Sequence, residues 1–194
     1  MGVLLTGFEP FGGADTNPSW EAVRRVPEEI AGYRVVKLRL PTVFGQAAEL
    51  LRGEIARLRP EVVICCGVAN GRTSLTPELV AINYRHARIP DNAGQVFLDQ
   101  PIDPDGPAAY MTRLPVHGMV DAMQAAGLPA SLSLSAGAYV CNDVYYALLG
   151  CEEAYGHRGL FLHVPGTDVA DASQAARGIA LCAEMALNDV AANK

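Results

Sequence analysis

The sequence predicts one three-layer α/β/α domain, residues 1–194, built around a mostly parallel, twisted sheet. Three observations predict this fold class. Strand-like and helix-like segments alternate over residues 3–67, which is the order typical of parallel α/β proteins. The strand-like runs have almost continuous apolar centres, as strands covered by helices on both faces do. A chain of 194 residues can also bury a large core, so we expect folding to need neither a disulfide nor a metal.

The first part of the chain has the clearest pattern. Apolar runs predict strands over 3–8, 33–40 and 61–67. Asn17 and Pro18 predict a helix start, because Asn caps helices and Pro favours their first position; this helix extends to about Val26. A second helix is expected over 47–58, where apolar residues recur at helical spacing until Pro60.

The second part is less regular. We expect, in order, a strand over 78–84, an irregular excursion over 85–108, a helix over 110–126, a strand near 130–135, a helix from about 142, a strand over 159–164 and a C-terminal helix. The excursion is rich in Pro, Gly, Asp and Asn, and loops of that length are uncommon and often functional. The apolar stripe of the last helix comprises Ile179, Cys182, Ala186 and Val190.

Composition limits the classes of function. The net charge is −6 and no run of Lys or Arg forms a phosphate-binding stripe, so we expect no nucleic-acid partner. No apolar run approaches the roughly 18 residues of a membrane span, and the chain enters a strand without a signal-peptide pattern. Five cysteines lack disulfide or zinc spacing, which indicates reduced thiols. We therefore expect a cytoplasmic protein without a metal.

Three residues form a candidate catalytic set. Cys141 precedes a predicted helix, whose unpaired N–H groups and partial positive charge favour a thiolate. His163 lies near the end of a predicted strand, where α/β sheets present ligand-facing groups. Glu78 follows Pro77 at the start of another. Each has a simpler interpretation, respectively an inert core thiol, a buried core histidine and a strand-edge charge, but together they suggest a cysteine hydrolase.

The other cysteines fit an inert role. Cys65, Cys66 and Cys182 lie within apolar runs, and Cys151 lies near the end of a predicted helix. Alternation along the third strand places Cys65 and Cys66 on opposite faces.

A glycine-rich loop over 7–13 carries Phe8 and Phe11. It lacks the G-x-G-x-x-G order and the lysine of a phosphate-binding loop, so it predicts no nucleotide cofactor. Two phenylalanines in such a loop suit a small flat ligand, while core packing beneath the loop is the simpler interpretation.

Many ordered segments together resemble the type I pyroglutamyl peptidases, or pyrrolidone carboxyl peptidases, which are cytosolic cysteine exopeptidases. The resemblance covers nearly the whole chain. The segments that carry it are residues 4–13 (LLTGFEPFGG), 17–20 (NPSW), 40–44 (LPTVF), 76–78 (TPE), 80–83 (VAIN), 87–92 (ARIPDN), 105–110 (DGPAAY), 135–137 (SAG) and 140–142 (VCN).

The resemblance implies a function and a catalytic set. It implies hydrolytic removal of an N-terminal pyroglutamyl residue from peptides through a thioester, with no metal or organic cofactor, and commonly a homotetramer. It places the nucleophile at Cys141, the base at His163 and the third member of the triad at Glu78. Arg88 matches an arginine close to the reacting carbonyl, where the Cys141 backbone N–H is the other expected oxyanion donor.

The resemblance also implies a substrate pocket, with one departure. Phe8 and Phe11 match the aromatic pocket residues, and Tyr139 falls on a position that is often phenylalanine. The family pattern Gly-Gln-Ala-Gly-Gly-Arg reads GVANGR over 67–72, so Val68 replaces a glutamine and offers no hydrogen bond. The segment before His163 is also short.

Two other functions fit the same residues. One is a cysteine amidase that acts on a different small cyclic or acylated amide. The other is a non-catalytic α/β module that binds a small ligand, for which an inert Cys141 thiol would be the sign.

Overall fold

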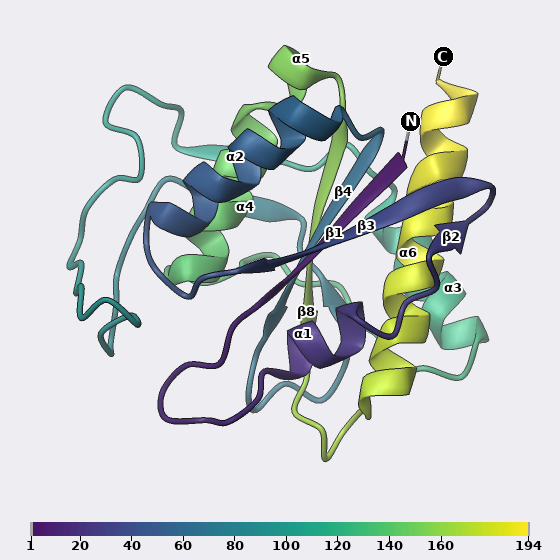
Figure 1. Ribbon diagram of the computed structural model, residues 1–194, viewed down its shortest axis with the longest axis horizontal. Helices are drawn as coiled ribbons and strands as arrows, with labels where there is room; N and C mark the ends of the chain where they lie inside the picture. The colour runs from purple at the N-terminus through teal and green to yellow at the C-terminus, as the bar shows by residue number, and fades with distance from the viewer. Residues whose placement is uncertain (1, 194) are drawn as a thin grey trace.

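The computed structural model describes residues 2–193 and contains a six-stranded sheet of order β2-β3-β1-β4-β8-β5 (Figure 1). β3, β1, β4 and β8 are parallel, and the short edge strands β2 and β5 pair antiparallel. The strands are β1 (Gly2–Phe8), β2 (Glu29–Ile30), β3 (Tyr33–Leu40), β4 (Val62–Val68), β5 (Thr76–Pro77) and β8 (Arg158–Val164). A second sheet pairs β6 (Val80–Ile82) with β7 (Ala109–Met111).

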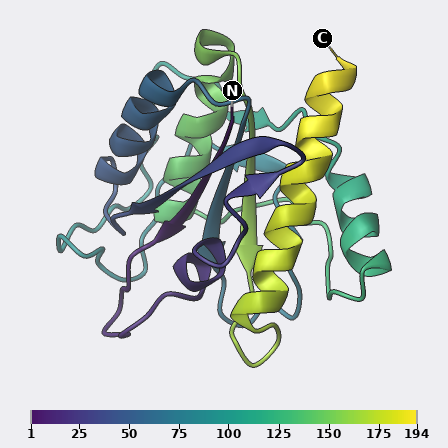
Figure 2. The same ribbon diagram turned by 45° about the vertical axis from the view of Figure 1, so that its right-hand side comes forward.

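Helices cover both faces of the large sheet. They are α1 (Pro18–Val23), α2 (Gln46–Leu58), α3 (Val116–Ala125), α4 (Val140–Gly150), α5 (Glu152–Tyr155) and α6 (Ala172–Ala192). α1, α3 and α6 pack on one face, and α2 and α4 pack on the other (Figure 2). Each face has its own buried apolar cluster, and Cys65 and Cys66 belong to different ones, as strand alternation requires. The predicted mostly parallel α/β architecture is confirmed.

The first part of the fold follows the predicted pattern closely. β1, β3 and β4 occupy the predicted strand positions to within about one residue, and α2 occupies the second predicted helix. Asn17 caps α1, since its side-chain oxygen accepts the Ser19 backbone N–H at 3.0 Å, and Pro18 opens the helix. The helix ends at Val23 rather than near Val26, and residues 24–25 form a turn.

The strand predicted over 78–84 is confirmed only over Val80–Ile82, which is β6. Two shorter strands flank Glu78 and belong to different sheets: β5 lies at the edge of the large sheet, and β6 pairs with β7. Pro77 has no N–H to donate and ends the edge strand, so the chain turns at Glu78 and directs its carboxylate into the protein, where it is fully buried.

The helix predicted over 110–126 is shorter, because Tyr110 lies in β7 and α3 begins at Val116. Pro115 explains the difference, since a residue before proline avoids the helical conformation. The predicted strand near 130–135 is wrong. Only isolated bridges join Ala130 to Leu75 and Ser133 to Glu78, and serine side chains there bond to nearby backbone groups, which competes with a regular ladder.

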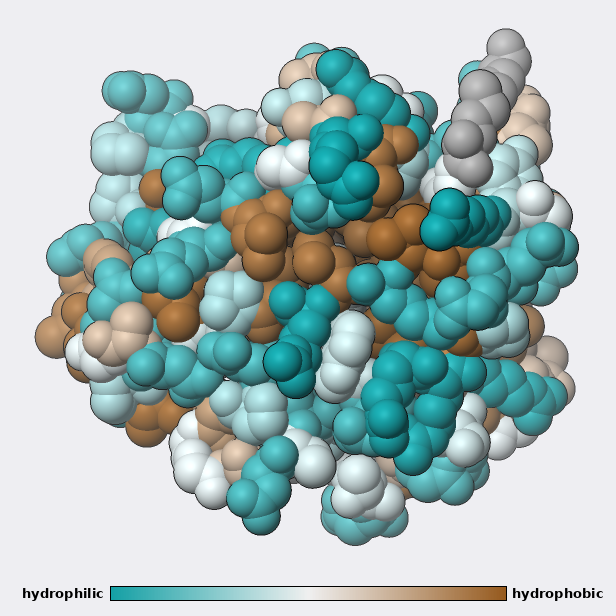
Figure 3. All heavy atoms as spheres, viewed as in Figure 1, coloured by the Kyte–Doolittle hydropathy of each residue, from teal (hydrophilic) through white to brown (hydrophobic). Residues whose placement is uncertain are grey.

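The excursion over 85–108 contains no helix or strand, as expected, and forms the long loop at the left of Figure 1. Asn92 ties it to the loop after β1 by donating to the Pro10 carbonyl at 2.8 Å. Over the view of Figure 3, apolar side chains gather along β3 between α2 and α6. None of the described helices is long and apolar enough to cross a lipid bilayer.

Candidate active site

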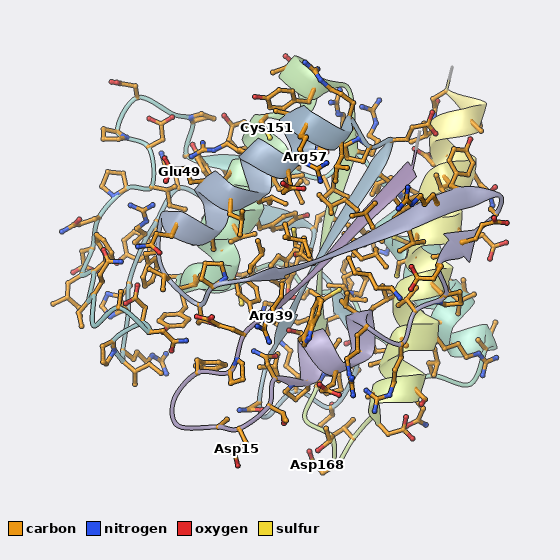
Figure 4. The ribbon with its side chains drawn as sticks, viewed as in Figure 1. Asp15, Arg39, Glu49, Arg57, Cys151 and Asp168 are labelled. Atoms are coloured by element: carbon orange, nitrogen blue, oxygen red, sulfur yellow. The ribbon has the colours of Figure 1, made fainter. Side chains whose placement is uncertain are left out.

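The candidate residues meet at the carboxyl end of the parallel strands. The loops that follow β1 and β8 both lie at this end, as Asp15 and Asp168 show in Figure 4, while Cys151 and Arg57 lie toward the opposite end. Open α/β sheets bind ligands at this edge, because the loops that vary most are collected there.

Cys141 occupies the first turn of α4. Tyr139 is the N-cap, and the helix begins at Val140, two residues earlier than expected. Its backbone N–H is therefore one of the first-turn groups that have no acceptor within the helix. A methyl group added at Gly67 would lie 2.7 Å from the Cys141 sulfur, so the thiol packs directly against the backbone at the end of β4. The glycine creates the space that the thiol occupies.

His163 lies in β8 beside this point. It is opposite Gly67 in the parallel pairing of β4 and β8. Its Nδ1 is 2.7 Å from Glu78 Oε1, and both side chains are buried. The main chain holds Glu78 in place, because its N–H donates to the Phe161 carbonyl at 2.9 Å and its own carbonyl accepts the Tyr145 hydroxyl at 2.7 Å. The predicted Glu78, Cys141 and His163 thus converge from three separate segments.

Burial opposes charge on both the thiol and the imidazole. Burial, together with the nearby Glu78 carboxylate, raises the pKa of Cys141 to about 12. Burial also lowers the pKa of His163, against the effect of Glu78. The effect of the helix N-terminus, which was expected to favour a thiolate, is therefore outweighed by burial. The favoured resting pair is a neutral thiol and a neutral imidazole.

A small pocket opens beside the thiol. Phe8, Phe11, Val68, Tyr139 and Cys141 all line it, together with Asn17, Thr42 and Val140. The two aromatic side chains of the glycine-rich loop and Tyr139 thus lie where the sequence predicts a pocket. Val68 lies there too, so the departure from the family pattern falls within the candidate binding surface.

The polar side chains of this pocket are already engaged. Asn17 caps α1 and donates to the Glu9 carbonyl at 3.0 Å. The Thr42 hydroxyl donates to the same carbonyl at 3.1 Å. The pocket wall is consequently apolar in character, and a polar ligand group would have to pair with backbone N–H and C=O groups.

Arg88 lies in a neighbouring groove rather than on the pocket with the thiol. The groove shares Phe11 and Tyr139 with the pocket and is also lined by Tyr84, His86 and Arg88. Arg88 is exposed, and none of the hydrogen bonds or ion pairs among residues 2–193 involves it. Its guanidinium is available to a ligand that extends out of the pocket.

Sequence reasoning missed three contributors. Gly67 makes room for the thiol, Thr42 lines the pocket, and Arg72 binds Glu78, with Nη1 2.6 Å from Oε1. Gly67 and Arg72 both lie in the GVANGR segment, which starts with the last two residues of β4 and in which only Val68 was singled out from the sequence. A glycine at the end of a buried strand is the signal that could have identified the close approach.

A cysteine at a helix N-terminus, a buried His–Glu pair and an adjoining apolar pocket on an α/β sheet define a cysteine hydrolase. Comparison with known proteins narrows this class. The chain belongs to the pyroglutamyl peptidase family, whose family model matches residues 1–193. Members of this family are cysteine peptidases that remove N-terminal pyroglutamyl residues, and this is the activity of the present enzyme.

Individual relatives agree with the family match. A pyrrolidone-carboxylate peptidase of Levilactobacillus brevis is 52% identical over 167 residues, which are 85% of this chain and 82% of that protein. One from Bacillus licheniformis is 48% identical over 166 residues, which are 84% and 77% of the two chains.

The solved structures agree as well. The crystal structure of pyroglutamyl peptidase I from Bacillus amyloliquefaciens has a TM-score of 0.90 at 38% identity and covers 96% of each chain. A mutant pyrrolidone carboxyl peptidase from Pyrococcus furiosus has a TM-score of 0.93 at 34% identity, covering 98% of this chain and 100% of that one.

Proposed function

We propose that the chain cleaves the amide bond after an N-terminal pyroglutamyl residue with Cys141 as nucleophile, His163 as base and Glu78 as the group that orients His163. The observation that carries this assignment is the 2.7 Å contact between His163 Nδ1 and Glu78, made beside the only half-buried cysteine among the described residues. Because Nδ1–H donates to the carboxylate, Nε2 is left free to accept a proton.

The reaction begins from a neutral pair. As the sulfur attacks the pyroglutamyl carbonyl, the thiol proton moves to His163, and a carbon–sulfur bond forms. The resulting imidazolium is stabilised by Glu78 and returns the proton to the leaving amine as the amide bond breaks. Water then attacks the thioester, with His163 again taking a proton, and the released thiol recovers it. Proton and nucleophile move together, which avoids a free thiolate in a site that burial makes unfavourable to charge.

The carbonyl oxygen becomes negative in the transition state and needs donors. The Cys141 backbone N–H, free in the first turn of α4, is the first of them. Arg88 is the second: it reaches from the neighbouring groove, where it has no other partner. Removing one such donor typically costs about 2.7–4 kcal/mol of transition-state stabilisation.

The pocket accounts for the choice of a pyroglutamyl residue. Its nitrogen is part of a neutral lactam, so the site needs no carboxylate to bind an N-terminal ammonium. Phe8, Phe11 and Tyr139 supply apolar faces for the flat ring. A free glutamyl or glutaminyl N-terminus would bring an unpaired charge into this apolar wall, and its desolvation would exclude it.

The decisive experiment is hydrolysis of pyroglutamyl-aminomethylcoumarin by the wild type and by Cys141→Ser, beside prolyl and glutamyl analogues. We expect release from the pyroglutamyl substrate alone, and its loss in the variant. Activity that survives in Cys141→Ser would overturn the nucleophile. Cleavage of other cyclic amides in preference to the pyroglutamyl substrate would favour the amidase alternative.

We further propose that residues 1–194 act as one domain, that copies form a homo-oligomer, a tetramer by family resemblance, and that the protein works in the cytoplasm. Three large apolar side chains exposed on the 85–108 loop, Ile89, Val96 and Leu98, support association, because exposed apolar surface marks interfaces. Sedimentation of the purified chain tests this: a mass that remains at 20.6 kDa at micromolar concentration would contradict it.

A further inference from the structure

Arg72 joins two parts of the site that lie far apart in the chain. Its Nη1 lies 2.6 Å from Glu78 Oε1 and also donates to the Thr76 hydroxyl. Its Nη2 donates to the Ser135 carbonyl at 3.1 Å. One guanidinium thus contacts the carboxylate that orients His163 and the segment that leads into α4, where Cys141 lies.

We propose that Arg72 is a positioning residue that fixes the Glu78 carboxylate against His163 and ties it to the 135–139 segment before the nucleophile. The inference rests on the proposed function, because it assigns Arg72 a task in the same triad. Arg72 does not line the pocket with the thiol, so it acts through Glu78 and not on the substrate.

The carboxylate of Glu78 depends on few contacts for its orientation. His163 and Arg72 both bind the same oxygen, Oε1. The second oxygen, Oε2, is buried and has no hydrogen-bond partner among residues 2–193. Without Arg72, a single contact to His163 would have to hold the carboxylate. Loss of the orienting contact would misplace the imidazole, and displacements of about 1 Å can cost about 10²-fold in rate.

An arginine suits this position better than a lysine. The guanidinium is a planar fork whose donors point in fixed directions, which lets Nη1 serve Glu78 and Thr76 while Nη2 serves Ser135. A lysine ammonium carries the same charge but cannot span these partners from one rigid plane.

Arg72 also sets the electrostatic balance of the pair. The charged and titratable groups that face Cys141 and His163 are Glu78, Arg72 and the Cys65 thiol. Glu78 raises the pKa of both reacting groups, and the positive charge of Arg72 lowers both. Removing this charge would leave burial as the only effect that opposes Glu78, so the pKa of His163 would rise. Since neutral His163 is the base, activity would then be lost at a higher pH on the acid side.

The experiment compares Arg72→Met and Arg72→Lys with the wild type. For Arg72→Met we expect kcat to fall about 10²-fold with KM changed little, and the acid limb of the pH–activity profile to move to higher pH. Arg72→Lys restores the charge without the fork, so we expect the acid limb to return toward its wild-type position while kcat stays low. A wild-type kcat and profile in Arg72→Met would overturn the inference.

Arg113→Met is the matched control. Arg113 pairs with the buried Glu152 at 2.8 Å, an arginine–glutamate pair of the same kind remote from the thiol. It should alter thermal stability without moving the acid limb. An equal shift in both variants would mean that loss of any such pair acts through stability, and the inference would fail.

A second measurement separates this inference from the proposed function. The rate at which iodoacetamide alkylates Cys141, followed by mass spectrometry without any substrate, reports thiol reactivity directly. Arg72→Met should slow alkylation at neutral pH relative to Arg113→Met, because the thiolate loses its nearest positive charge. Absence of peptidase activity in the wild type would refute the proposed function alone, whereas unchanged alkylation would refute the role of Arg72. Should Arg72→Met fail to fold, Arg72→Lys still tests the positioning role, because kcat should fall while the acid limb and the alkylation rate stay near those of the wild type.

Discussion

A cysteine, a histidine, a glutamate and an arginine lie together at each of the two ends of α4 and β8, but the two groups are arranged differently. At one end Cys141, His163, Glu78 and Arg72 meet in the candidate active site. At the other end Cys151 and His157 both contact the Leu148 carbonyl, at 3.4 Å and 3.2 Å. There the buried Glu152 binds Arg113 and the Gly159 N–H.

The difference lies in what each histidine faces. His163 Nδ1 binds a carboxylate, whereas His157 Nε2 binds a backbone carbonyl at the C-terminal end of α4. Cys141 lies among unpaired N–H groups at the start of that helix, and Cys151 lies among carbonyls at its end. Burial shifts the pKa of both histidines downward, so a shifted pKa alone does not identify a site. The carboxylate partner, the helix N-terminus and the pocket distinguish the reactive end.

The largest expected difference between the two ends concerns the cysteines. Cys141→Ser should lower kcat by about 10⁴-fold or more, because the nucleophile is lost, while Cys151→Ser should keep near-wild-type kcat. Hydrolysis of pyroglutamyl-aminomethylcoumarin by the two folded variants measures this. A comparable loss in Cys151→Ser would show that the two ends are not functionally distinct.

The glutamates should differ next. Glu78→Gln keeps the shape of the side chain but removes the charge that stabilises the imidazolium, and we expect kcat to fall by about 10²- to 10⁴-fold. Glu152→Gln should lower the melting temperature and leave kcat within a few-fold. Turnover at the wild-type level in Glu78→Gln would remove this residue from the triad.

His157 should make the protein less stable in acid. Burial lowers its pKa from 6.5 to about 4 in the folded chain. Between these values the unfolded chain binds the proton and the folded chain does not, so the free energy of unfolding falls as pH falls from 6.5 toward 4. The full effect is about 3 kcal/mol. Denaturant unfolding across this range should show a shallower pH dependence in His157→Gln than in the wild type, and equal slopes would exclude this origin.

The smallest expected effect is on the pocket beside the reactive end. Val68→Gln would restore an amide donor and acceptor where the family pattern has glutamine, and we expect KM for the pyroglutamyl substrate to fall by a few-fold, with kcat little changed, since one neutral hydrogen bond contributes about 1 kcal/mol. Val68→Leu, which adds bulk without a polar group, is the control. A higher KM in Val68→Gln would indicate that the pocket has adapted to the apolar side chain.

Periodicity predicted the part of the fold that depends on local pattern. Apolar runs predict strands β1, β3 and β4, and Asn17-Pro18 predicts the start of helix α1. Both signals act on residues only a few positions away. The region between β4 and α4 depends on long-range contacts instead. There only residues 80–82 of the strand expected over 78–84 belong to a strand, and Pro115 delays the start of the helix expected over 110–126 to Val116.

The same distinction applies to the site. Glu78, Cys141 and His163 could be named from the sequence because each lies at a segment end and matches the family resemblance. The task proposed for Arg72 could not be inferred, because it depends on a turn that brings Arg72 back to Glu78 and on a contact with Ser135, 63 positions away along the chain. Arg88 is the opposite case. The resemblance identifies it as a site residue, but only the structure shows that it lies in a groove next to the pocket.

Gly67 matters when the sequence of a relative is used to decide whether that relative is active. A single added methyl group there would meet the Cys141 sulfur at 2.7 Å and the Phe161 ring at 2.9 Å. This one added carbon atom would therefore displace the Cys141 sulfur, although every residue of the triad would still be present in the sequence. We expect a relative that retains cysteine, histidine and glutamate but carries alanine at this position to look intact to a search for the triad alone and to be inactive.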